Sequence, residues 1–305
     1  MKFDTILTNP PFQDSINRKK TPHKLWIEFT IAVFGRLLED GGSLVQVSPA
    51  SFSSPSNVVL ELMERNRTRV LRFGTGHYFP NVASTFSDYW IEKVRDNDST
   101  TKVVVGDESF EVKLDRSMSY LPSDLNRLSI SIHRKVMFAD RQLLPVEWDY
   151  VTAHNIRRHK VNPTLVVDKI SSHPYPVFHT NNKTWWSSIR QDWANEKKVM
   201  WTRSGYTKPF FDEGVLGGTD MVYYVRVDSK LEGECLAHNM NSELMRYIYK
   251  SAKWSGFGNE RVFANLPEVP RDRKLSEAEM YSIFEIDEEE VNYVRESLEP
   301  RRRKA

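Results

Sequence analysis

The stretch Phe3-Asp4-Thr5-Ile6-Leu7-Thr8-Asn9-Pro10-Pro11-Phe12 carries the strongest structural signal in this sequence. A short apolar run that ends in Asn-Pro-Pro-aromatic is typical of a strand that leads into a binding loop. Neither proline has a backbone N–H, so the turn offers carbonyl oxygens without competing donors. Each proline also pushes the residue before it towards extended geometry, which fixes the direction of those oxygens.

These residues predict a pocket for an aminated heteroaromatic base. The side-chain oxygen of Asn9 and the carbonyl of Pro10 can both accept hydrogen bonds from one exocyclic NH2 group. Phe12 supplies a flat apolar face on which a ring can stack. We therefore take Asn9, Pro10, Pro11 and Phe12 as the predicted catalytic residues, although a plain Pro-Pro turn after a strand is the simpler alternative.

The residues after this motif predict a βαβ unit. Thr21-Pro22 is a favourable helix start, with Thr as N-cap and Pro at the first helical position. Apolar residues then recur at helical spacing as far as Leu38, and Gly41-Gly42 is expected to end the helix. Residues 44–47 are expected to form a buried strand that ends in Ser48-Pro49-Ala50-Ser51-Phe52.

From residue 4 to about residue 55, this order resembles the N6-adenine DNA methyltransferases of restriction–modification type. Their catalytic motif is Asn-Pro-Pro-Tyr or Asn-Pro-Pro-Phe at the carboxyl end of a central strand. The resemblance implies an α/β, Rossmann-like methyltransferase sheet, a flipped adenine as substrate and S-adenosylmethionine as methyl donor. It also implies that a later aromatic residue packs on the flipped base beside Phe12. Phe79 and Phe86 are the candidates, and core packing explains either of them equally well.

The cofactor-binding half of such an enzyme is not visible in the sequence. A Rossmann-like cofactor site needs a strand, a glycine turn and a helix, then an acid for the ribose. In the usual order of these enzymes this half precedes the catalytic motif, yet only eight residues precede Asn9. The glycine cluster at Ser255-Gly256-Phe257-Gly258-Asn259 has no apolar strand running into it. We therefore expect S-adenosylmethionine binding and DNA methylation to require a second polypeptide that supplies this half.

A basic, aromatic-rich segment follows the catalytic region. Residues 151–211 contain ten Lys or Arg against three Asp or Glu, with four tryptophans among them. Cations for phosphates and flat rings for unstacked bases are the footprint of nucleic-acid binding, although a run of charges can also be a solvated face. The predicted DNA-binding residues are Arg157, Arg158, Lys160, Lys183, Trp185, Trp186, Arg190 and Arg203.

The order of predicted elements divides the chain into four parts. Residues 1–95 form the catalytic region, and residues 96–125 contain a hairpin or linker around Gly106-Asp107. Residues 126–270 form an α+β target-recognition domain that binds double-stranded DNA. Residues 271–305 form a helical acidic tail with a basic end, in which Asp287 and Glu290 predict a capping box.

Composition is that of a globular protein without a membrane segment. The 305 residues are 39% hydrophobic and 28% charged, and no apolar run approaches 18 residues. Cys235 is the single cysteine, which excludes an intramolecular disulfide and a cysteine-based zinc cluster. We expect a cytoplasmic protein and predict no metal site.

Two other functions remain open at this point. The chain could be a non-catalytic DNA-specificity subunit of a methyltransferase assembly, although such a subunit has no use for an intact Asn-Pro-Pro-Phe pocket. It could also be an RNA methyltransferase, because phosphate contacts do not distinguish the two polymers. The basic segment disfavours a protein substrate.

Overall fold

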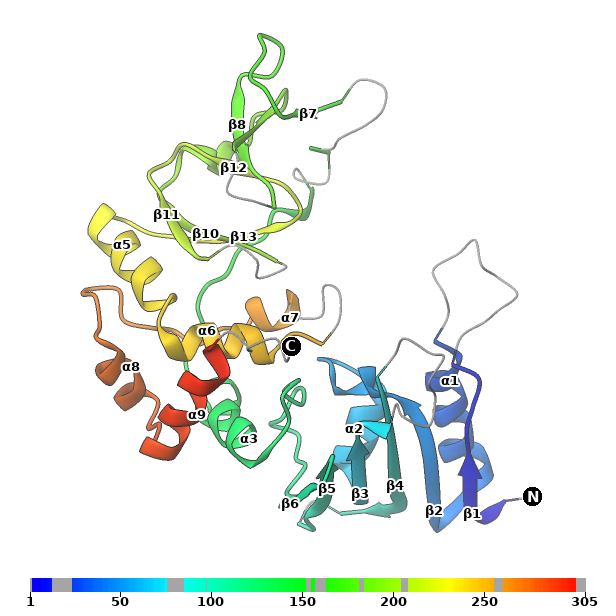
Figure 1. The fold of residues 1–305 in the computed structure, drawn as a ribbon. Helices are drawn as coiled ribbons and strands as arrows, with labels where there is room; N and C mark the ends of the chain where they lie inside the picture. The colour runs from blue at the N-terminus through cyan, green and yellow to red at the C-terminus, as the bar shows by residue number, and fades with distance from the viewer. Residues whose placement is uncertain are drawn as a thin grey trace, which may run out of the picture. The chain divides into compact units, whose positions relative to one another are not determined.

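The computed structural model describes residues 2–12, 24–75, 85–96, 98–151, 155–156, 163–180, 184–203, 208–254 and 260–299 (Figure 1). The chain forms two compact units, Met1–Ser131 and Ile132–Ala305. The division falls within helix α3 (Arg127–His133).

Unit 1 is built on a mixed six-stranded sheet with the order β1-β2-β4-β3-β5-β6. β1 runs parallel to β2 and β3 parallel to β5, whereas the β2–β4, β3–β4 and β5–β6 pairs are antiparallel. The predicted α/β class and the parallel βαβ unit are thus confirmed. The strands are β1 (Phe3–Thr8), β2 (Leu38–Pro49), β3 (Asn66–Phe73), β4 (Phe86–Arg95), β5 (Thr101–Val105) and β6 (Glu108–Val112).

The crossover from β1 to β2 contains helix α1 (Leu25–Ala32), which continues as a π-helical turn (Val33–Leu37). The prediction that Gly41-Gly42 ends this helix is wrong, because both glycines lie inside β2. Gly41 has a positive φ of 85° where the β1–β2 register shifts. A Cβ on Gly42 would lie 2.9 Å from the carbonyl oxygen of Asp4. The glycines therefore permit a bulge and a close approach of the two strands.

A short 3-10 helix (Ala50–Ser53) and helix α2 (Val58–Arg65) follow β2. The side chain of Asn57 accepts a hydrogen bond from the Val59 N–H and caps α2. The predicted hairpin is confirmed as β5–β6, with Gly106 at a positive φ of 60°. Because β5 pairs with β3, this hairpin extends the sheet of unit 1.

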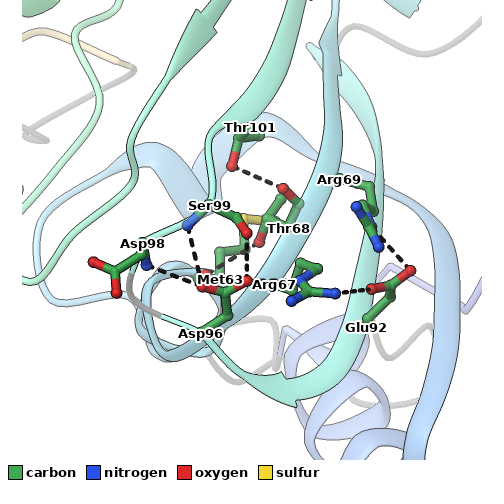
Figure 2. Close-up of polar contacts among 9 residues, drawn as sticks. All are labelled: Met63, Arg67, Thr68, Arg69, Glu92, Asp96, Asp98, Ser99 and Thr101. Atoms are coloured by element: carbon green, nitrogen blue, oxygen red, sulfur yellow. Dashed lines mark hydrogen bonds and ion pairs between the residues drawn. The ribbon is translucent and has the colours of Figure 1, made fainter.

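A polar network joins β3 and β4 to the turn before β5 (Figure 2). The Asp96 carboxylate accepts hydrogen bonds from the Ser99 hydroxyl and from Arg67 Nε, which lies 2.6 Å from Oδ2. These hydrogen bonds hold the pKa of Asp96 well below its usual range. Glu92 binds both Arg67 and Arg69. The network fixes the chain where it leaves β4.

Unit 2 contains two small sheets. The first is antiparallel, with β10 (Lys198–Thr202) between β11 (Phe210–Asp212) and β13 (Val222–Arg226). The second sheet has the order β12-β8-β9-β7, and a 3-10 helix (Asp192–Asn195) follows β9. Its strands are β7 (Leu165–Val166), β8 (Tyr175–Phe178), β9 (Thr184–Ser187) and β12 (Gly217–Gly218).

The other regular elements in the described part of unit 2 are helices. Their shared core includes Leu236, Leu244, Ile248, Phe263 and Met280. The predicted Asp287–Glu290 capping box is confirmed. The helical segments are α5 (Lys230–Asn239), α6 (Glu243–Ser251), α7 (Glu260–Phe263), α8 (Glu277–Ile283) and α9 (Glu288–Leu298), with a π-helical turn after α3 (Arg134–Phe138).

Candidate base-binding site and nucleic-acid interface

The Asn9-Pro10-Pro11-Phe12 motif lies directly after the carboxyl end of β1. Because β1 and β2 are parallel and pair Thr8 with Gln46, the motif shares this edge of the sheet with the end of β2. Ligands of open α/β sheets bind beyond the carboxyl ends of parallel strands. The structure thus places the motif where a sheet of this kind holds its ligand.

Antiparallel β4 begins at the same edge, where Phe86 pairs with Pro49 of β2. The ring of Phe86 lies against the ring of Phe12, with centroids 5.2 Å apart and planes inclined by 39°. Phe86 is 1% exposed, whereas Phe12 is half-buried. Phe86 therefore supports Phe12 from the core side, and Phe12 keeps part of its ring accessible.

The remaining motif residues differ in exposure. Pro10 is buried and anchors the turn, while Asn9 and Pro11 are exposed. The Asn9 side chain can thus reach a ligand that approaches from solvent. An amide acceptor beside a supported aromatic ring can hold an amine and stack its ring.

A buried polar network fastens α1 to this part of the sheet. Gln46 Nε2 donates to Thr30 Oγ1 at 2.6 Å and to the hydroxyl of Tyr89 at 2.8 Å. Thr30 in turn donates to the Trp26 carbonyl. Burial raises the pKa of Tyr89 to about 12, so this phenol stays neutral. These residues were not among the predicted site residues, and their signal in the sequence was the polar Gln46 within an apolar strand.

Several predicted site residues lie outside the described residues. They are the stacking candidate Phe79 and the DNA-binding candidates Arg157, Arg158, Lys160 and Lys183.

Three other DNA-binding candidates lie in or beside β9. Trp185 is buried and packs edge-on against His179, with ring centroids 5.4 Å apart. Trp186 is half-buried, and Lys169 Nζ lies 4.9 Å from the centre of its ring. Arg190 is exposed. Neighbouring strand residues point to opposite faces, so Trp185 and Trp186 lie on opposite faces of this sheet, and the ring of Trp186 packs against the Lys169 cation.

The last candidate, Arg203, follows β10 and stacks on an aromatic side chain. Its Cζ lies 4.1 Å from the centre of the Trp148 ring, and its Nη1 donates to the Asp220 carbonyl at 2.8 Å. Trp148 was not among the predicted residues. Its signal in the sequence was the stretch Glu147-Trp148-Asp149-Tyr150, in which two aromatic residues alternate with two acids outside the basic segment.

S-adenosylmethionine, which the predicted activity requires, needs a glycine turn that joins a strand to a following helix. Among the described residues, four glycines adopt positive φ: Gly41 in β2, Gly74 after β3, Gly106 in the β5–β6 turn and Gly214 before β12. Within the described part of the chain, none of the four joins a strand to a following helix. These residues therefore do not provide the glycine turn that would cradle the cofactor.

No helix in the described ranges is both long and apolar enough to span a membrane.

The chain matches no protein-family model and no curated protein. Similar solved structures are proteins of restriction–modification systems. The M protein of the type I restriction enzyme EcoKI is 16% identical over 34% of this chain and 25% of its own, with a TM-score of 0.28. The type IIL enzyme MmeI, in complex with DNA, is 11% identical over 96% of this chain and 56% of its own, with a TM-score of 0.40.

A nuclease-deletion mutant of the type ISP enzyme LlaGI, in complex with a DNA substrate mimic, is 9% identical. The match covers 88% of this chain and 40% of the LlaGI chain, with a TM-score of 0.44. The chain thus spans between a quarter and about half of the length of these proteins.

Proposed function

We propose that this chain is the base-handling and DNA-recognition part of a site-specific DNA adenine-N6 methyltransferase of restriction–modification type. The supporting observation is the arrangement at the carboxyl edge of β1 and β2. There the exposed Asn9 and the buried Pro10 lie beside Phe12, which Phe86 supports at 5.2 Å. We propose that the sheet is the carboxyl part of a Rossmann-like catalytic domain.

In this proposal the target adenine leaves the duplex, at a cost of a few kcal/mol of unstacking. The side-chain oxygen of Asn9 and the carbonyl of Pro10 accept the two N6 hydrogens. Phe12 stacks on the ring, and Phe86 keeps Phe12 in place. These contacts orient N6 with its lone pair free, so the chain contributes binding and orientation of the acceptor.

We propose that the methyl donor, S-adenosylmethionine, is held by a second polypeptide. The free edge of β1 supports a partner at this place. In the described part of the sheet β1 pairs with β2 alone, and its Phe3 and Leu7 are 44% and 75% exposed. Helix α1, which follows in the chain, also exposes Phe29 and Ile31. An edge strand with exposed apolar side chains is a template for pairing with another chain.

The deciding experiment reconstitutes the chain with the product of the neighbouring reading frame and measures methyl transfer to adenine in duplex DNA. Asn9→Ala should abolish transfer and leave DNA affinity within a few-fold, because its hydrogen bond matters in the chemical step. Asp107→Ala, at the exposed β5–β6 turn on the opposite side of the sheet, is the matched control and should keep the parent rate. Transfer by Asn9→Ala at the parent rate would refute the assigned role.

Cofactor binding provides an independent test. Calorimetry of the chain alone with S-adenosylmethionine should show no tight binding, and the second polypeptide should restore it. Micromolar binding at one site of the isolated chain would show that it contains its own cofactor site.

The missing glycine turn in the described residues also favours a second candidate, a non-catalytic DNA-specificity subunit. The reconstituted assembly distinguishes the two. A specificity subunit would change which DNA site is methylated, and Asn9→Ala would leave the rate unaffected. Competition with RNA of the same sequence would separate DNA from RNA as the substrate.

A further inference from the structure

Trp148, Tyr150 and Arg203 form a surface cluster in unit 2, here called the aromatic–arginine platform. The rings of Trp148 and Tyr150 have centroids 5.1 Å apart, and Arg203 Cζ lies 4.1 Å from the centre of the Trp148 ring. Trp148 is 37% exposed and Tyr150 is 52% exposed. Large aromatic side chains therefore face solvent beside a cation.

Hydrogen bonds to the backbone and packing on a buried ring hold Trp148 and Arg203 of the platform in place. The carbonyl of Asp220 accepts hydrogen bonds from Trp148 Nε1 at 3.0 Å and from Arg203 Nη1 at 2.8 Å. The backbone of Arg203 also donates to the Met221 carbonyl at 2.8 Å. The ring of Tyr223, which is buried, packs edge-on against Trp148. Groups fixed in advance lose little conformational entropy when they bind a ligand.

The acids next to these aromatics have partners elsewhere. Glu147 pairs with Tyr224 of β13 through two backbone hydrogen bonds, so the chain is extended here. Its carboxylate lies 2.8 Å from Arg226 Nε. Asp149 accepts a hydrogen bond from Trp193 Nε1 at 2.7 Å. The carboxylates of Glu147 and Asp149 thus contact Arg226 and Trp193, whereas the rings of Trp148 and Tyr150 contact each other.

We propose that the platform binds an unstacked nucleobase of DNA. The base stacks on the exposed aromatic rings, and Arg203 contacts the adjacent phosphate. An apolar protein segment would have to bury the guanidinium, whereas a nucleic-acid strand supplies both a flat ring and a negative charge. The inference rests on the proposed DNA-binding function and adds to it the residues that hold a base outside the Asn9 site.

The test uses the full chain and two probes: a single-stranded oligodeoxynucleotide and a duplex with one unpaired 2-aminopurine. Tyr150→Ala should weaken binding of both about tenfold and abolish quenching of the 2-aminopurine, with the salt dependence unchanged. Tyr150→Phe should restore binding, because the ring is retained. The control is Tyr175→Ala. It removes a tyrosine that is 37% exposed and lies in β8, in the four-stranded sheet of unit 2.

Arg203→Gln provides the second readout. It should lower the slope of log affinity against log salt by about one unit, because one phosphate contact is lost. Binding and quenching by Tyr150→Ala equal to those of the parent would overturn this inference and leave the proposed role of Asn9 intact. Failure of the parent chain to bind either probe would overturn both proposals.

Discussion

The ring of Phe12, just after the first strand, lies 5.2 Å from the ring of Phe86, the first residue of β4. The contact depends on two strand pairings. Parallel β1–β2 pairing brings the motif to the end of β2, and antiparallel β2–β4 pairing brings Phe86 to Pro49. A substitution of Phe86 should therefore alter the position of Phe12 in the base-binding loop.

We predict that Phe86→Leu reduces methyl transfer by the reconstituted enzyme at least about tenfold, because Phe12 loses its support. Phe52→Leu is the matched control. Phe52 is also buried, but its ring packs against the rings of Phe73 and Tyr89. Each substitution should cost about 1–3 kcal/mol of stability. Equal losses of activity in the two variants would show that Phe86 acts only through stability.

The basic residues Arg157, Arg158 and Lys160 should contact DNA phosphates. Their joint replacement by Gln is expected to weaken DNA binding and to reduce the slope of log affinity against log salt, by up to about one unit per lost contact. Arg65→Gln, at an exposed ion pair with Glu61 on α2, is the control for net charge. A salt titration with an unchanged slope would mean that the three residues form a solvated face.

The buried ion pair of Lys198 and Asp212 should matter greatly for stability. Lys198 Nζ lies 2.7 Å from Asp212 Oδ2, and the two side chains are 0% and 5% exposed. Lys198→Met leaves a buried carboxylate without its cation and should cost about 3–5 kcal/mol in the free energy of unfolding. Adding Asp212→Asn should recover part of this loss.

The control for this buried pair is the exposed ion pair of Arg226 and Glu196. Glu196→Gln should lower the free energy of unfolding by no more than about 1 kcal/mol. Urea unfolding of the parent and of these three variants measures the differences. A loss from Lys198→Met as small as that from Glu196→Gln would contradict the prediction.

Glu64 should make stability fall as pH rises. Burial, together with the nearby carboxylates of Glu61 and Asp115, raises the pKa of Glu64 to about 8. The folded state therefore holds this proton more tightly than the unfolded state, where the ordinary value is 4.5. The resulting stability is fully present below pH 4.5 and is lost as pH rises towards 8.

Glu64→Gln removes the titration. The variant should gain stability relative to the parent between pH 5 and pH 8, with the largest gain at pH 8. A stability difference between Glu64→Gln and the parent that does not change with pH would rule out titration of this group in the range.

The sequence by itself determined the features that depend on neighbouring residues. The prolines after Asn9 set the backbone of the motif through their own rings. Asn57 caps α2, and Asp287 with Glu290 forms a capping box, because each needs a hydrogen bond only two or three residues away. The β5–β6 hairpin likewise follows from its two-residue turn at Gly106.

The tertiary structure decided what depends on partners distant in the chain. Gly41 and Gly42 have the local pattern of a helix end, yet pairing with β1 places them at a bulge in β2. The strand order β1-β2-β4-β3-β5-β6 and the contact of Phe12 with Phe86 arise from pairing between remote segments. Local propensities carry no information about such pairing, because its free energy comes from side chains buried together only after the sheet has formed.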